Sequence, residues 1–196
     1  CFYIPMSVFD GIVGHEPIIR VLTHALVKPA PCYLFCGPHG VGKRAIAERF
    51  AAALLGASLN AHPDFIRIVR EEGAREIVVK QVRELLLRMQ LTSARGGYKV
   101  ALIETADRLN EEAANALLKA VEEPWAKTVY IFLAEQPDKL PATLRSRLVN
   151  LAFARVPTKN RASHFSLEQK EGWLREMDWS KMLDALLASP LGKQLA

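Results

Sequence analysis

Residues 32–43 of the chain read CYLFCGPHGVGK, and they indicate the fold class more directly than any other part of the sequence. Its apolar first part, Cys32–Cys36, is short and is followed by a glycine, which is typical of a buried strand in a parallel sheet. The next residues fit the pattern G-x-x-x-x-G-K, in which glycines let backbone N–H groups surround a phosphate. Strong helix formers follow from Lys43 to Leu55, and Gly56 ends them. A phosphate-binding loop between a strand and a helix predicts an α/β domain.

The rest of the chain continues to alternate between strands and helices. Apolar residues at helical spacing predict helices at residues 15–26, 79–89 and 111–123, and Asn110 can cap the last of them. Apolar or alternating runs predict further strands at residues 65–69, 100–103, 128–134 and 148–153. This alternation predicts a mostly parallel sheet flanked by helices.

Three segments are expected along the chain. Residues 1–5 precede Met6, which resembles a natural start, so they are set aside as extra or non-native residues. Residues 6–155 form the predicted phosphate-loop domain. The composition changes near Pro157, and short helical patterns follow, so residues 156–196 are expected to begin a small helical second domain.

Composition excludes some classes of protein. The chain has 196 residues, of which 50% are apolar, yet no apolar run approaches the ~20 residues of a membrane-spanning helix. No secretory signal opens the chain, so a cytoplasmic location is expected. Cys32 and Cys36 are then expected to be buried, reduced thiols, and no metal site is predicted because zinc needs about four clustered ligands. A net charge of +5 permits contact with nucleic acid but does not establish it.

The candidate nucleotide-binding residues form one continuous loop, in which Lys43 can reach the outer phosphates. They are Gly37, Pro38, His39, Gly40, Val41, Gly42, Lys43 and Arg44. In a working P-loop the residue after the lysine is Ser or Thr, whose hydroxyl holds Mg²⁺. Arg44 stands there instead, and a guanidinium cannot bind a cation. It either pairs with a phosphate or points to solvent, so normal Mg·ATP geometry is in doubt.

The acidic motif expected to complete such a site is degenerate. The strand at 100–103 ends in Glu104 and Thr105, where an ATPase of this class has Asp and Glu. Glu104 can still serve as a metal-side carboxylate, whereas Thr105 cannot act as a general base. Asp107 lies two residues further along. Glu104 and Asp107 can equally be surface acids at a strand end, so ATP or ADP is a candidate ligand and none is certain.

Three other segments resemble the AAA+ subunits of clamp loaders. Residues 8–15, VFDGIVGH, look like the family's opening motif near the adenine. Residues 113–124, AANALLKAVEEP, are very similar to its AANALLK-x-x-EEP segment. Residues 139–147, KLPATLRSR, resemble the segment that carries a Ser-Arg-Cys motif, with Leu148 in place of the cysteine. The resemblance covers about residues 8–153 and implies a RecA-like AAA+ domain followed by a partial helical lid.

Within that family, the chain resembles the delta-prime branch. His62-Pro63-Asp64 matches a delta-prime stretch, and the chain lacks the four-cysteine zinc module that tau/gamma subunits carry. The polar sensor 1 residue corresponds to Glu135, and the sensor 2 arginine corresponds, in a weaker alignment, to Gly192. Family members usually continue into a helical collar, so a chain ending at Ala196 is expected to be a fragment or to lack the collar.

The resemblance implies a non-motor subunit of the DNA polymerase III clamp loader, with little ATPase activity of its own. The implied partners are tau/gamma and delta subunits, the sliding clamp and, through the assembled complex, primed DNA. Arg147 is implied to be an arginine finger that reaches the γ-phosphate held by a neighbour, although the residues alone favour an ordinary surface pair. The rival functions are an ATP-hydrolysing tau/gamma-like subunit, a P-loop small-molecule kinase and a scaffold domain.

Overall fold

The computed structural model describes residues 6–155 and is built on one five-stranded parallel sheet. The strand order is β2-β3-β4-β1-β5. The strands are β1 (Cys32–Cys36), β2 (Phe65–Ile68), β3 (Lys99–Ile103), β4 (Thr128–Ala134) and β5 (Val149–Ala152). The predicted α/β class with a parallel sheet is confirmed. The predicted helical lid and Gly192 lie outside the described residues, as do residues 1–5.

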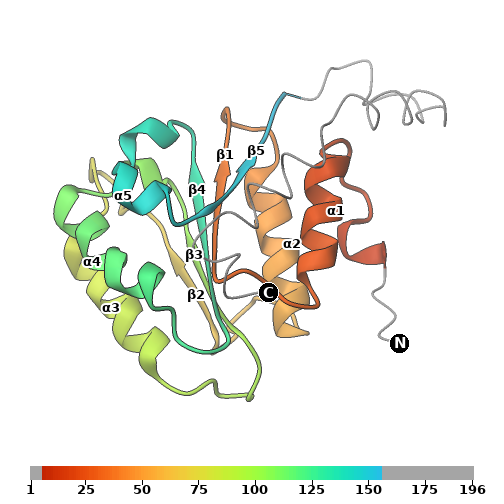
Figure 1. Ribbon diagram of the computed structural model, residues 1–196, viewed down its shortest axis with the longest axis horizontal. Helices are drawn as coiled ribbons and strands as arrows, with labels where there is room; N and C mark the ends of the chain where they lie inside the picture. The colour runs from red at the N-terminus through yellow and green to blue at the C-terminus, as the bar shows by residue number, and fades with distance from the viewer. Residues whose placement is uncertain (1–5, 156–196) are drawn as a thin grey trace. The chain divides into compact units, whose positions relative to one another are not determined.

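Helices cover both faces of the sheet (Figure 1). On one face lie α1 (Glu16–Ala25) and α2 (Lys43–Leu55), and on the other lie α3 (Val79–Gln90), α4 (Glu111–Glu122) and the short α5 (Ala142–Arg145). Short 3₁₀ helices occur at η1 (Met6–Phe9), η2 (Ala106–Arg108) and η3 (Pro137–Lys139). Among residues 6–155, every helix is too short or too polar to cross a bilayer.

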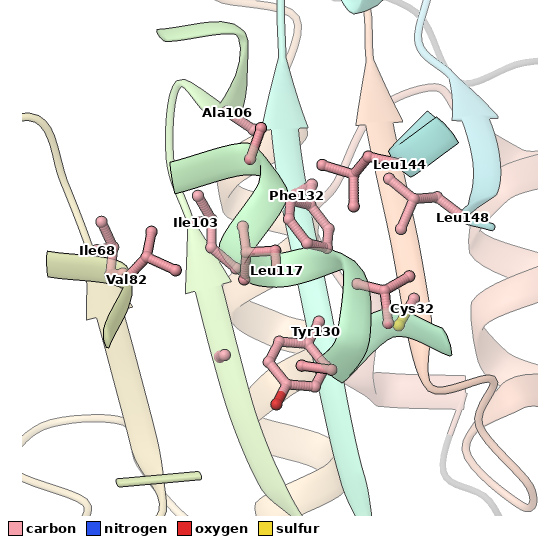
Figure 2. Packing of buried hydrophobic residues seen from close by; sticks show 14 of the residues in the cluster. Cys32, Ile68, Val82, Ile103, Ala106, Leu117, Tyr130, Phe132, Leu144 and Leu148 are labelled. Atoms are coloured by element: carbon pink, nitrogen blue, oxygen red, sulfur yellow. The ribbon is translucent and has the colours of Figure 1, made fainter. Parts of the chain in front are cut away.

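Alternate side chains of each buried strand supply two separate cores, because successive residues of a strand point to opposite faces. Cys32 and Leu34 of β1 join the core under α3 and α4, whereas Tyr33 and Phe35 join the core under α1 and α2. Figure 2 shows the first core, with Leu117 of α4 over the sheet. Both described cysteines are buried thiols, as predicted.

The carboxyl ends of all five strands meet at one edge of the sheet, because the strands are parallel. The loop after β1, residues 37–42, leaves this edge between β4 and β5. Glu104 follows β3 and Glu135 follows β4 at the same edge. Open α/β sheets bind ligands at this edge, where the strand order reverses. The fold thus brings together the loop and two of the acidic residues singled out in the sequence, Glu104 and Glu135.

Candidate functional site

The loop after β1 has the backbone conformation of a phosphate cradle. Gly37, Gly40 and Gly42 have φ angles of 147°, 75° and 98°, which L side chains rarely adopt. A Cβ atom at Gly40 or Gly42 would meet no atom within 4 Å, so both positions border open space. Gly37 differs, because a Cβ there would collide with the carbonyl oxygen of Phe153. Gly37 therefore also lets the chain after β5 approach the end of β1.

Lys43 opens α2 and points back into the loop. Lys43 is only 8% exposed, and its Nζ donates to the carbonyl oxygens of Gly37 at 2.6 Å and Pro38 at 2.7 Å. An ammonium has three donors, so one remains for a phosphate oxygen. Burial lowers the pKa of Lys43, while the nearby carboxylates of Glu135 and Asp107 oppose that lowering.

Arg44 turns away from the loop into a group of alternating charges. Its Nε lies 2.8 Å from Oε1 of Glu48 and 3.5 Å from Oε1 of Glu104. Arg67 of β2 completes the group, with its Nε 2.6 Å from Oε1 of Glu104 and its Nη2 paired with Glu48. We call Arg44, Glu48, Arg67 and Glu104 the arginine–glutamate cluster. In this structure Arg44 thus pairs with carboxylates, an arrangement that the sequence did not predict.

The arginine–glutamate cluster does not fit Mg²⁺, which the fold family would place here. Mg²⁺ requires oxygen ligands in near-octahedral geometry. Arg44 offers no oxygen, and Oε1 of Glu104 lies within ion-pair distance of two guanidinium groups, although it accepts no hydrogen bond among the described residues. Within the described ranges, no group of three or more His, Cys, Asp or Glu side chains is placed to hold a metal ion. Fixed positive charge stands where a metal would be needed.

Thr105 separates the two candidate carboxylates of the acidic motif. Its φ of 52° and ψ of 47° are in the left-handed region, which is unusual for a β-branched residue. The side chain of Thr105 is exposed, and the chain turns at once into η2. Oδ1 of Asp107 in η2 is buried without a hydrogen-bond partner among the described residues, and this carboxylate acts on the charge of Lys43. Glu104 joins the arginine–glutamate cluster, whereas Asp107 belongs to the surroundings of the lysine.

Glu135, which follows β4, reaches across to the loop. Its Oε1 accepts a hydrogen bond from Nδ1 of His39 at 2.8 Å. On the other side of the loop, Nε2 of His15 lies 2.8 Å from the carbonyl oxygen of Val41, which ties the opening motif to the loop. A carboxylate at residue 135 adds negative charge beside the phosphate cradle and therefore weakens its attraction for a triphosphate.

Arg147 lies beyond α5 and is not part of the cradle. Its Nη2 is 2.6 Å from Oε1 of Glu122 at the end of α4, and its Nη1 donates to the carbonyl oxygen of Thr143. In the described part of the chain, no hydrogen bond or ion pair joins Arg147 to residues 37–44. Arg145 pairs separately with Asp138. The two arginines of this segment thus have different partners.

Comparisons with known proteins show the family to which the chain belongs. The chain matches the family described as DNA polymerase III, delta subunit, over residues 14–157. A DNA polymerase III subunit delta' of Pseudomonas aeruginosa is 41% identical over 140 residues, which cover 63% of this chain and 43% of that protein. The chain belongs to the delta-prime family of clamp-loader subunits.

Other relatives show both branches of the family. The delta-prime subunit of Escherichia coli is 34% identical over 166 residues, which cover 84% of this chain and 46% of that protein. A tau subunit of Salmonella typhimurium is 33% identical over 155 residues, covering 71% of this chain and 24% of that protein. The chain thus spans less than half the length of the delta-prime relatives named here.

Solved structures establish the fold of this delta-prime chain. A gamma-subunit-related protein of Thermotoga maritima superimposes with a TM-score of 0.63 at 20% identity, covering 90% of this chain and 60% of that one. The RuvB Holliday junction branch migration motor of Thermotoga maritima gives 0.58 at 22% identity, covering 76% and 48%. The expected AAA+ fold is confirmed.

Sequence reasoning missed Arg67 and Glu48 as parts of the site. Arg67 interrupts the apolar residues of β2, so its side chain points away from Ile66 and Ile68, which face the α3 and α4 core. Glu48 lies four residues after Arg44 on α2, a spacing at which opposite charges pair. Those two signals were available, but only the register of the sheet connects them to Glu104.

Proposed function

We propose that this delta-prime chain is a non-motor part of a DNA polymerase III clamp loader, working with tau/gamma and delta subunits to place the sliding clamp on primed DNA. The arginine–glutamate cluster carries the proposal. A subunit whose acidic motif is neutralised by Arg44 and Arg67 lacks the metal site that ATP hydrolysis needs. Family membership supports the partners, and replication as a process implies a cytoplasmic location.

We further propose that Arg147 acts in trans, as an arginine finger for a neighbouring ATPase subunit. A guanidinium suits this task because it is always charged and its planar fork matches phosphate oxygens. The side chain of Arg147 is 33% exposed and is bound to α4 and α5 rather than to its own loop. A chain that does not hydrolyse ATP at its own loop would then contribute by completing the ATP site of the neighbouring subunit.

The test is reconstitution of the full-length protein with tau/gamma, delta, clamp and primed DNA. Arg147→Ala should assemble normally but remove the turnover of the one ATP site that it completes, since a finger contributes about 10³- to 10⁵-fold in rate. Arg145→Ala is the matched control and should do less, because it breaks only the pair with Asp138. Normal clamp loading by an assembled Arg147→Ala complex would show that Arg147 is a surface charge.

An ATP-hydrolysing role is the second candidate, favoured by the 33% identity to a tau subunit. It requires Glu104 to leave both arginines and a base to replace Thr105. Measurable turnover by the isolated protein, at about 1 per second or more, would support it over the non-motor role.

A further inference from the structure

Glu122 lies where an acidic side chain is normally unfavourable. It is the last residue of α4, whose carbonyl groups make that end of the helix partly negative. Asn110, Glu111 and Glu112 at the other end obey the usual preference. Lys119 is the usual cation in the last turn of this helix, and Glu122 has its own partner in Arg147, whose Nη2 lies 2.6 Å from Oε1 of Glu122.

The backbone on both sides of Arg147 is anchored in the core. Leu144 is fully buried and Leu148 is 8% exposed. Figure 2 shows both side chains directed toward Phe132 of the sheet. The base of the arginine is thereby fixed, and only its side-chain torsions decide where the guanidinium lies. A free arginine side chain loses substantial rotamer entropy when it is ordered.

The contacts of the guanidinium restrict those torsions without using up its donors. Nη2 pairs with Glu122 and Nη1 donates to the carbonyl oxygen of Thr143. A guanidinium carries five N–H donors, so others remain for phosphate oxygens. The side chain of Glu122 is 45% exposed, and an ion pair as exposed as this contributes little to folding stability. The ion pair therefore restricts the orientation of the Arg147 guanidinium more than it stabilises the fold.

We propose that Glu122 is a positioning residue for Arg147, holding the guanidinium in one orientation before a neighbouring subunit presents its nucleotide. The inference rests on the proposed arginine-finger role. Loss of the carboxylate should leave the finger present but mobile, so the neighbour would bind ATP normally and hydrolyse it more slowly.

The experiment is a double-mutant cycle in the full-length protein, assembled with tau/gamma, delta, clamp and primed DNA. Glu122→Gln should lower the rate constant of ATP hydrolysis at the one site that Arg147 completes about three- to tenfold, with KM unchanged. Glu122→Asp, which keeps the charge, should retain more of the rate. Glu123→Gln is the matched control, since that neighbour forms no ion pair within residues 6–155 and should behave like the wild type. In an Arg147→Ala background, Glu122→Gln should have no further effect.

The outcomes separate the two proposals. A normal rate for Glu122→Gln, beside an impaired Arg147→Ala, overturns the positioning role and leaves the finger intact. A normal rate for Arg147→Ala overturns the proposed function itself. Additive losses in the double variant would mean that Glu122 supports the end of α4 independently of Arg147, and they overturn the inference. Melting temperatures of the isolated variants identify any that fail to fold, and Glu122→Asp then carries the cycle.

Discussion

Gly37 meets two demands at the residue scale, because it shapes the phosphate cradle and also makes room for the carbonyl oxygen of Phe153. Gly37→Ala should lower the free energy of unfolding by about 3 kcal/mol or more, since overpacking against backbone adds to an unfavourable φ. Gly40→Ala has the φ penalty alone and should cost about 1 kcal/mol. Urea denaturation of both variants measures the difference, and equal losses would contradict the close approach of Phe153.

Arg44 allows a second residue-scale prediction. Arg44→Thr supplies the missing hydroxyl, but Glu104 stays paired with Arg67 and Thr105 still cannot activate water. The variant should therefore show negligible ATP hydrolysis, as should the wild type, in a coupled assay with Mg²⁺. Lys43→Ala provides the background rate. Turnover at about 1 per second in Arg44→Thr would show that Glu104 is available to a metal after all.

Asp64, before β2, joins distant parts of the chain at the element scale. It accepts hydrogen bonds from the backbone of Ala94 and Arg95 and from the hydroxyl of Ser93. Burial by itself raises the pKa of Asp64, but these donors outweigh it, and the net pKa is lowered below the ordinary value. In the same His62-Pro63-Asp64 segment, Nδ1 of His62 accepts a hydrogen bond from the backbone amide of Asp64. The His62-Pro63-Asp64 segment therefore holds residues 93–95 against the start of β2.

The pH dependence follows from the sign of that shift. A carboxylate with a lowered folded pKa contributes stability above its unfolded value of about 3.9, and the contribution is lost as the pH falls through the folded pKa. Asp64→Ala should destabilise the protein by about 2–3 kcal/mol at pH 7 and lose less stability between about pH 4 and pH 2 than the wild type. Denaturation at several pH values measures the free energy of unfolding of both proteins. An equal loss of stability in the wild type and in Asp64→Ala between about pH 4 and pH 2 would contradict the lowered pKa.

Sequence reasoning succeeded for elements whose causes are local. The bounds of α2 were predicted from its loop and Gly56, and the predicted cap is present, since Oδ1 of Asn110 accepts from the amide of Ala113 at 2.8 Å. The arginine–glutamate cluster was missed because it depends on the register that pairs Ile68 with Ile103. The left-handed Thr105 was missed because a β-branched residue gives no signal for it.

At the scale of the whole molecule, the charge of the chain allows a prediction about DNA. A net charge of +5 spread over 196 residues supports only a few phosphate contacts. The isolated protein should bind duplex DNA weakly and without sequence preference, with a slope of log K against log salt of about −0.9 for each contact. Fluorescence anisotropy between about 50 and 200 mM salt measures it. Tight, sequence-specific binding would indicate a different function.

The arginine–glutamate cluster joins α2, β2 and the end of β3 by charges that the chain itself supplies. In a P-loop ATPase the loop and the acidic motif are joined instead through Mg²⁺ and the phosphates of the bound nucleotide. In this chain the arginine–glutamate cluster makes the link with its own side chains, so the link does not depend on the concentration of ATP or ADP. During starvation, when ATP falls and ADP rises, this module should keep the shape that it has in a growing cell.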